Sequence, residues 1–283
     1  MSKLIPVISA SGGAGKTTIS LLLAYVLAHY VGVDLKRILL VDLDPTAGLS
    51  LRTLGEEGYE EMCENRRTLY HMDLDLRRGK NVRIEEYVDA PGKRAVALAN
   101  VPILPPGEDE EGDITSRLEE WFKYGDRERL RALLERSHAL EEYEYVIIDS
   151  APFFDARYSV VAASVSKKVV IPLKPTITDI KRTIRMVNKL RQHSIGIEPI
   201  YIFNFDKDKL SREAATLKDA GITVPTNRGA RVDAALRRQI EELRKTGTIV
   251  GYAMSYYKSL SDSNFPQGDP DDDDIESVCP PLM

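Results

Sequence analysis

A glycine-rich segment near the N-terminus carries the residue types that bind phosphate groups. Residues 11–18 read Ser-Gly-Gly-Ala-Gly-Lys-Thr-Thr, between an apolar run that predicts a strand and an amphipathic stretch that predicts a helix. Glycines let the backbone wrap closely around a phosphate, and successive N–H groups at a helix start supply positive potential. Lys16 is placed to reach the outer phosphates, and the Thr17 hydroxyl to ligate Mg²⁺. The residues assigned to nucleotide binding are Gly12, Gly13, Ala14, Gly15, Lys16, Thr17 and Thr18.

Acidic side chains follow two other apolar runs. Residues 41–45 read Val-Asp-Leu-Asp-Pro, and residues 145–152 read Tyr-Val-Ile-Ile-Asp-Ser-Ala-Pro. Acids at the carboxyl ends of parallel strands point into the ligand crevice of an open α/β sheet. We therefore expect Asp42, Asp44 and Asp149 beside the glycine-rich segment, although each acid taken alone also fits a solvated turn.

Short apolar runs alternate with longer amphipathic stretches along the chain, and this predicts strands alternating with helices. The expected strands are residues 4–9, 37–41, 95–104, 145–148, 169–171 and 200–203. The expected helices are residues 17–30, 118–140, 179–193 and 231–245, with Asp179 as the cap of the third. Pro6 would be awkward in a central strand, because it cannot donate to a sheet ladder. The expected fold class is α/β, a single domain with a mostly parallel, doubly wound sheet flanked by helices.

The charge of the chain is unevenly distributed. The whole chain carries a net charge of −5, but residues 262–283 hold seven acids and no base, so the remainder carries +2. Residues 1–261 are therefore expected to form the domain, and residues 262–283 an acidic, flexible tail. The N-terminus lacks a signal-peptide pattern and no apolar run is long enough to span a membrane, which predicts a cytoplasmic protein. Cys63 and Cys279 form no C-x-x-C pair, so neither a disulfide framework nor a cysteine-built metal site is expected.

The paired glycines are similar to the deviant loop K-G-G-x-G-K-[ST] of the ParA/MinD family of partition and positioning ATPases. Ala10 stands where the standard loop spacing would place a glycine. The segments around Asp44 and Asp149 resemble the D-x-D-P and hhhhD-x-x-P motifs of the same family. One position departs from the family pattern. The first lysine of the loop, which reaches a partner subunit's nucleotide, is replaced by Ser11.

The resemblance implies a P-loop fold, ATP and Mg²⁺ as cofactors, and slow, partner-stimulated ATP hydrolysis by a chain that dimerises when ATP is bound. It gives Asp44 the role of orienting the attacking water, with Lys16 as the second catalytic residue. It places Asp42 and Asp149 on Mg²⁺ through its waters, with Thr17 as a ligand. A hydroxyl at position 11 cannot neutralise charge on the transferred phosphoryl group, so the dimer chemistry or its rate is expected to differ. Arg157 is one candidate for a replacement charge.

The resemblance continues along most of residues 1–260. The matching pieces are residues 170–172, 202–204, 224–225 and 247–252. They imply that Asn204 and Pro225 contact adenine, although a buried asparagine at a strand end also fits a purely structural hydrogen bond. Residues 55–94 match no family motif and are a candidate insertion.

Basic side chains gather in two stretches. Residues 180–193 hold five lysines and arginines and no acid, and a second cluster lies at residues 228–238. Such surfaces bind nucleic-acid phosphates without sequence specificity and in a salt-sensitive way, although a solvated basic face is an open alternative. The candidate DNA-binding residues are Lys181, Arg182, Arg185, Lys189, Arg228, Arg231, Arg237 and Arg238.

These features favour a partition ATPase whose ATP-bound dimer coats DNA, with a centromere-binding protein that stimulates hydrolysis. The location expected for such a protein is the cytoplasm and the nucleoid. A positioning ATPase of the MinD or pilus type is an alternative, but the acidic C-terminal residues would be repelled by anionic lipid. An ATP-binding adaptor with little hydrolysis is a second alternative, motivated by Ser11.

Overall fold

The computed structural model describes residues 2–89, 98, 100–193, 195–205, 216–217, 219–220 and 233–254. Three of the predicted site residues, Pro225, Arg228 and Arg231, lie outside these ranges, as does the predicted acidic tail at residues 262–283. The boundary between domain and tail therefore stays a prediction.

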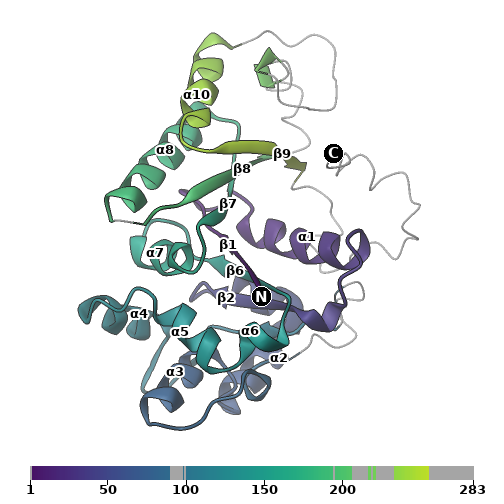
Figure 1. The fold of residues 1–283 in the computed structure, drawn as a ribbon, viewed down its shortest axis with the longest axis vertical. Coiled ribbons are helices and arrows are strands. Elements are labelled where there is room, and N and C mark those ends of the chain that lie inside the picture. Colours follow the sequence, from purple (N-terminus) through teal and green to yellow (C-terminus); the bar gives the residue numbers. More distant parts are fainter. Residues whose placement is uncertain are drawn as a thin grey trace.

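A seven-stranded sheet forms the centre of the molecule, with the strand order β3-β2-β6-β1-β7-β8-β9 (Figure 1). Every pair of neighbouring strands in it is parallel. The strands are β1 (Lys3–Val7), β2 (Ile38–Leu43), β3 (Ile103–Leu104), β6 (Tyr145–Ser150), β7 (Lys168–Leu173), β8 (Glu198–Phe205) and β9 (Thr248–Met254). A separate antiparallel hairpin joins β4 (Glu108–Asp109) to β5 (Gly112–Asp113).

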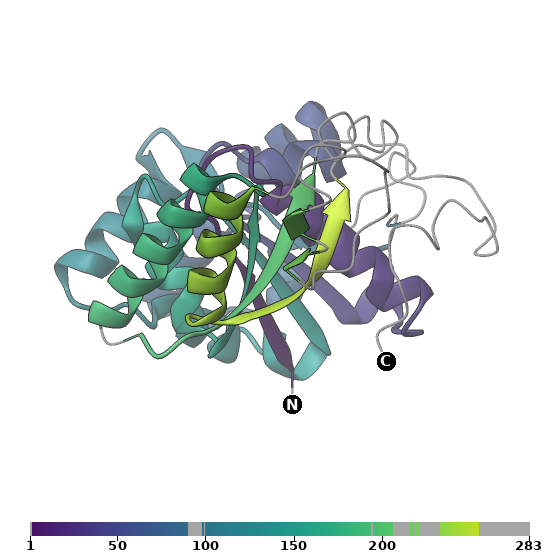
Figure 2. The same ribbon diagram turned by 90° about the horizontal axis from the view of Figure 1, so that it is seen from above.

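Helices cover both faces of the sheet, which confirms the predicted doubly wound α/β fold. They are α1 (Lys16–His29), α2 (Gly48–Glu64), α3 (Leu69–Arg77), α4 (Ile114–Lys123), α5 (Arg129–Arg136), α6 (Ala139–Glu142), α7 (Ala156–Ser164), α8 (Ile177–Gln192) and α10 (Ala234–Arg244). Among the described connections are the 3₁₀ turns η1 (Leu35–Arg37) and η2 (Ile84–Glu86). Figure 2 shows α1 on the opposite side of the sheet from α8 and α10.

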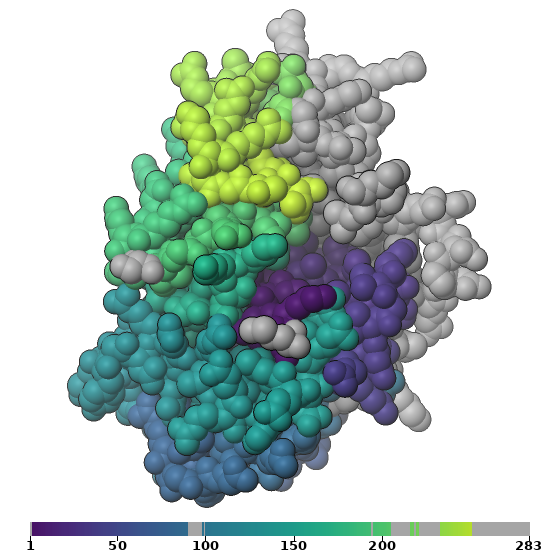
Figure 3. Space-filling view, viewed as in Figure 1, coloured from purple at the N-terminus to yellow at the C-terminus, as the bar shows by residue number. Residues whose placement is uncertain are grey.

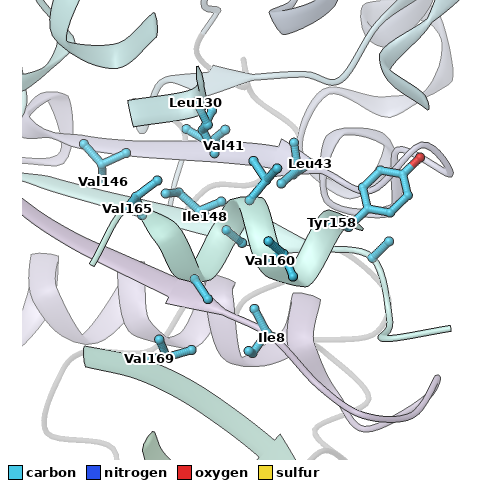
Figure 4. Packing of buried hydrophobic residues seen from close by; sticks show 14 of the residues in the cluster. Ile8, Val41, Leu43, Leu130, Val146, Ile148, Tyr158, Val160, Val165 and Val169 are labelled. Atoms are coloured by element: carbon cyan, nitrogen blue, oxygen red, sulfur yellow. The ribbon is translucent and has the colours of Figure 1, made fainter. Parts of the chain in front are cut away.

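Each central strand is apolar on both faces, because helices bury both. In β2, Val41 and Leu43 belong to the core under α3, α5 and α7, whereas Leu40 belongs to the core under α1 and α2. Figure 4 shows Val160 of α7 beside Ile148 of β6 in the first of these cores. Continuous apolar runs of this kind are typical of buried parallel strands, and they made the strands predictable.

The predicted single helix over residues 118–140 is wrong. The chain forms three helices there, α4, α5 and α6. Gly125 has φ +73° and His138 has φ +63°, and a left-handed residue ends a right-handed helix. The amphipathic pattern runs through both breaks, because all three helices bury their apolar sides in the same core.

The region from residue 55 to residue 89, part of the candidate insertion, is integrated into the fold. It contains most of α2, all of α3 and η2, and Gly55 with φ +78° kinks α2. Leu69 and Met72 of α3 are fully buried in the core. Of the strand predicted at residues 95–104, the structure shows Ile103–Leu104, and residues 95–97 and 99 lie outside the described ranges.

Pro6 lies in β1, a central strand, where its missing N–H needs an explanation. The Lys3 N–H donates to Glu144 O (2.8 Å) on the β6 side, and the Ile8 N–H donates to Val170 O (3.0 Å) on the β7 side. Even-numbered residues of β1 therefore turn their N–H groups towards β7. The register of β1 with β7 includes only Val7 opposite Val170, so the missing N–H falls before this ladder starts.

The cap of α8 is Thr176, not Asp179 as predicted. The Thr176 hydroxyl accepts a hydrogen bond from the Asp179 N–H (3.3 Å), and the helix begins at Ile177. Asp179 lies in the first turn, where its carboxylate reaches back to accept a hydrogen bond from the Lys174 N–H (2.7 Å). The first bond satisfies a donor that the helix start leaves open, and the second ties the segment before the helix to its first turn.

No helix in the described part of the chain is long and apolar enough to cross a membrane. Cys63 is a free thiol of intermediate burial, whereas Cys279 lies outside the described residues.

Candidate functional site

The carboxyl ends of β1, β2 and β6 meet at one edge of the sheet. Asp42 at the end of β2 is the register partner of Asp149 in β6, and Asp149 is in turn opposite Val7 of β1. The glycine-rich loop leaves the sheet directly after β1. The structure therefore brings together the loop and the acids that the sequence assigned to one crevice.

The loop places its lysine by two hydrogen bonds. Lys16 Nζ donates to Ser9 Oγ (3.2 Å), and Ser9 Oγ donates to the Ser11 carbonyl oxygen (2.8 Å). Gly13 has φ +66° and Gly15 has φ +90°, conformations that favour glycine. Gly12 and Gly13 are exposed at the outer side of the loop, which leaves their backbone accessible to a phosphate.

Lys16 is buried at the base of the loop, with 7% of its surface exposed. Burial lowers the pKa of its ammonium, whereas the charges of Asp149 and Asp44 raise it. Lys16 is the first residue of α1, and the N–H groups of a helix start bind anions.

Thr17 and Asp149 form the pair that fits a divalent cation. Thr17 Oγ1 donates to Asp149 Oδ2 (2.7 Å). Asp149 Oδ1 is buried and has no hydrogen-bond partner among the residues that the structure describes. A hydroxyl and an uncommitted carboxylate oxygen are ligands of the kind that Mg²⁺ takes beside a phosphate. The predicted roles of Thr17 and Asp149 are thus compatible with the geometry and stay a proposal.

The Asp42 carboxylate accepts hydrogen bonds from neighbouring protein groups. Its Oδ2 accepts hydrogen bonds from the N–H (2.9 Å) and the hydroxyl (2.8 Å) of Ser50, and its Oδ1 accepts one from the Asp44 N–H (3.1 Å). The side chain is fully buried. Asp42 therefore fixes the loop between β2 and α2, and its predicted action on Mg²⁺ through water molecules stays a prediction.

Burial raises the pKa values of both inner carboxyl groups. The pKa of Asp42 rises to about 7, through burial and then the charge of Asp149. The pKa of Asp149 rises to about 6 through burial, against the hydrogen bond from Thr17 and the charge of Lys16. Two buried acids on neighbouring strands with raised pKa values are a frequent feature of functional sites, and a bound cation would favour their ionised forms.

Asp44 is only partly buried and directly follows β2. Its Oδ1 accepts hydrogen bonds from the N–H (3.0 Å) and the hydroxyl (2.8 Å) of Thr46. Ala47 follows with φ +52°, in the left-handed region that favours glycine. A half-exposed carboxylate on a turn next to the loop is positioned to contact a water molecule, so the predicted catalytic role fits but is not tested by these contacts.

Asn204, at the end of β8, holds the loop in place. Its Nδ2 donates to the Ala14 carbonyl oxygen (3.0 Å), and its Oδ1 is buried without a partner in the described part of the chain. A Cβ atom on Gly15 would come within 1.8 Å of Asn204 Nδ2. The structural hydrogen bond left open by the sequence is therefore present, and adenine contact stays a proposal for Asn204.

Two residues that the sequence reasoning missed connect the site. Ser9 links Lys16 to the loop backbone, and Ser50 anchors Asp42 to α2. The sequence offered one signal for the role of Ser9, which is a small polar residue at the end of an otherwise apolar strand. It offered no signal for the role of Ser50, because serines are common at the start of a helix.

The basic face predicted on α8 is exposed. Lys181, Arg182, Arg185 and Lys189 all reach solvent, and within the described ranges none has an ion-pair partner. α10 packs beside α8, and the two form a continuous surface in Figure 3. Arg238 of α10 is exposed, whereas Arg237 pairs with Asp219 and Glu241. Among the described residues of the two predicted clusters, most of the cations without an ion-pair partner therefore lie on α8.

Comparisons with known proteins identify similar sequences and folds. A family model described as an AAA domain matches residues 2–197. The sporulation initiation inhibitor protein Soj of Bacillus subtilis is 28% identical over 217 residues, which cover 73% of this chain and 74% of that protein.

Two solved structures share the fold at low sequence identity. The ATP complex of McdA from Cyanothece has a TM-score of 0.63 at 19% identity and covers 93% of this chain and 88% of its own. A plasmid partition protein of Borrelia burgdorferi bound to AMPPNP has a TM-score of 0.61 at 18% identity, covering 95% and 93%.

Proposed function

The chain belongs to the AAA domain family and is a P-loop ATPase of the ParA/MinD type, and from this premise we propose that it is an ATP-dependent dimerisation switch in DNA partition. In this proposal the ATP-bound dimer binds DNA without sequence specificity, and a centromere-binding partner stimulates slow hydrolysis. The location that suits this function is the cytoplasm, in association with the nucleoid.

The hydrogen bond between Thr17 and Asp149, beside an unpartnered Asp149 Oδ1, is the observation that carries the ATPase proposal. Mg²⁺, when bound with ATP, would neutralise phosphate charge and help orient the phosphates. Lys16 moves from Ser9 to the outer phosphates, and the amides of residues 12–17 bind phosphate oxygens. Asp44 orients the attacking water.

The α8 face supports the DNA-binding part of the proposal. Its four exposed cations carry no ion-pair partner in the part of the chain that the structure describes, so they are available to phosphates. Contacts of this kind give affinity that depends strongly on salt and weakly on base sequence.

An ATP-binding adaptor with little turnover is a second candidate, and Ser11 favours it. Its hydroxyl is buried without a hydrogen-bond partner among the described residues, and it brings no charge to the loop. In an adaptor, Asp44→Ala would leave an already negligible turnover unchanged.

Calorimetry with Mg-ATP tests the common basis of both candidates. We expect the full chain to bind Mg-ATP, and Lys16→Ala to lose most of that affinity. The partition proposal requires in addition that ATP, but not ADP, retains the protein on DNA in a gel assay at low salt. Absence of Mg-ATP binding by the wild type would overturn the whole assignment, and ATP binding without DNA retention would overturn the partition function alone.

A further inference from the structure

A second lysine lies over the glycine-rich loop. Lys174 follows β7, and its Nζ is 3.4 Å from the position that a Cβ atom on Gly13 would occupy. β7 is the neighbour of β1 on the side opposite β6, and it ends at the same edge of the sheet. The Lys174 ammonium therefore reaches the loop from a different strand than Lys16 does.

The backbone of Lys174 is held by the start of α8. Its N–H donates to Asp179 Oδ2 (2.7 Å), and its carbonyl oxygen accepts a hydrogen bond from the Thr176 N–H (2.8 Å). These contacts belong to the capping arrangement of the helix. They fix the backbone position of Lys174. The side chain therefore starts from a fixed point, from which it extends to Gly13.

The Lys174 ammonium is available for a ligand. The side chain is exposed, and Nζ has neither an ion-pair nor a hydrogen-bond partner within the described ranges. Arg157, the replacement charge considered from the sequence, differs in this respect. Its guanidinium is bound to Asp155 (Nε–Oδ2 2.8 Å) and Glu119 (Nη1–Oε1 2.8 Å).

The entry half of the loop lacks a cation of its own. Ser11 stands where the family motif has a lysine, and Lys16 lies at the other end of the loop, at the start of α1. Gly13 is exposed and adopts φ +66°, so it presents no side chain between its backbone and Lys174. A phosphate on the entry half would meet Lys174 directly.

We propose that the Lys174 ammonium contacts the terminal phosphate of the bound triphosphate from within the same subunit, and supplies the charge that Ser11 does not. This rests on the proposed function, since it requires ATP in the loop. The inner phosphates lie against the amides at the helix start, so a cation over the entry half discriminates ATP from ADP. A charge at the transferred phosphoryl group also stabilises its transition state.

Calorimetric titration of the full chain with Mg-AMPPNP and with Mg-ADP tests this proposal. Lys174→Gln removes the charge, Lys174→Arg keeps it, and Lys168→Gln is the matched control, because Lys168 is exposed at the opposite end of the same strand. We expect Lys174→Gln to weaken Mg-AMPPNP binding by about tenfold or more, and Mg-ADP binding by less than about twofold. Lys174→Arg should retain most of the preference for Mg-AMPPNP over Mg-ADP. Lys168→Gln should bind both nucleotides with wild-type affinity.

The other outcomes are distinct. Equal losses for both nucleotides in Lys174→Gln, or no loss for either, would overturn the role of Lys174 while the ATPase assignment stands. A wild type that binds neither nucleotide would overturn the proposed function, and the inference with it. Because Lys174 is exposed, a thermal unfolding curve without nucleotide should be the same for all four proteins.

Discussion

The side chain of Asn204 occupies the space that a side chain on residue 15 would need. Its Nδ2 donates to the Ala14 carbonyl oxygen at 3.0 Å, and a Cβ atom built on Gly15 would lie 1.8 Å from the same nitrogen. The end of β8 thus fixes the loop that follows β1, two strands away in the sheet.

Gly15→Ala should abolish nucleotide binding. The new methyl group would meet the Asn204 amide and would also have to adopt φ +90°, so the loop has to move. Gly79→Ala is the matched control, because Gly79 has φ +78° but nothing within 4 Å of its Cβ position. We expect Gly79→Ala to cost about 1 kcal/mol of unfolding free energy and to leave Mg-ATP affinity unchanged in calorimetry. Wild-type affinity in Gly15→Ala would show that Asn204 does not constrain the loop.

Asp42 and Asp149 should make the nucleotide-free protein less stable as pH rises from about 4 to about 7, whereas the lowered pKa of the buried His71 acts in the opposite direction. The pKa of Asp42 is raised to about 7 and that of Asp149 to about 6 in the folded chain, both first by burial. Carboxyl groups in the unfolded chain titrate near pH 4, so between about pH 4 and pH 7 the folded state binds more protons at these two groups than the unfolded state. Their contribution to the free energy of unfolding therefore decreases as these protons dissociate from the folded state. The contribution is on the order of a few kcal/mol.

Urea unfolding in EDTA at pH 5 and pH 8 measures this dependence. Asp42→Asn should flatten the pH profile, because the amide does not titrate. Glu85→Gln, at an exposed carboxylate far from the crevice in sequence, is the control and should leave the slope as it is. An unchanged slope in Asp42→Asn relative to the wild type would contradict the raised pKa of Asp42.

Much of the fold and the phosphate loop could be predicted from local patterns. The loop is contiguous in sequence, and Asp42 and Asp149 directly follow apolar runs, so strand ends place them at one edge whatever the rest of the chain does. The contacts that these residues make could not be predicted from local sequence patterns. The N–H and the hydroxyl of Ser50 both donate hydrogen bonds to Asp42. These two bonds depend on the direction in which α2 leaves the sheet.

Errors arose where tertiary contacts decide a local choice. The pattern over residues 118–140 stays amphipathic through Gly125 and His138, so periodicity alone does not show where α4, α5 and α6 separate. Aspartate often caps a helix, but here Thr176 is the cap. Asp179 lies three residues later, where its N–H donates to the Thr176 hydroxyl and its carboxylate accepts a hydrogen bond from the Lys174 N–H. Lys174 was not considered, although a charged residue directly after a buried strand at the carboxyl edge is a usable signal.

Asp44→Ala should separate binding from hydrolysis. Asp44 is half-exposed, and within the described residues the hydrogen bonds of its carboxylate come from Thr46 and not from the glycine-rich loop or α1. Mg-ATP affinity should therefore stay within about threefold of wild type, while single-turnover phosphate release slows by about a hundredfold or more. An unchanged release rate would instead favour the adaptor with little hydrolysis.

Reversal of two charges on α8 should weaken DNA binding. Arg182→Glu with Arg185→Glu changes a face whose cations have no carboxylate partner in the described structure. The control, Lys36→Glu with Arg83→Glu, changes the net charge equally at exposed positions outside α8 and α10. In a filter assay with ATP at low salt, the α8 variant should lose about tenfold or more in affinity with a shallower salt dependence. Equal losses in both variants would indicate a net-charge effect and no specific DNA-binding face.

Ser11→Lys tests whether the loop lacks a charge or already has one from Lys174. Ser11 is buried with 8% exposed, and Lys174 Nζ lies close to Gly13, two residues further along the loop. If the two positions supply the same cation, Ser11→Lys alone should change the hydrolysis rate by less than about threefold, since only one charge is needed at the transferred group. In the Lys174→Gln background, the same substitution should recover about tenfold or more of the lost rate. Ser11→Gln, which adds length without charge, should recover none of it. A large gain from Ser11→Lys in the otherwise wild-type chain would mean that position 11 limits turnover, and that Lys174 does not take its place.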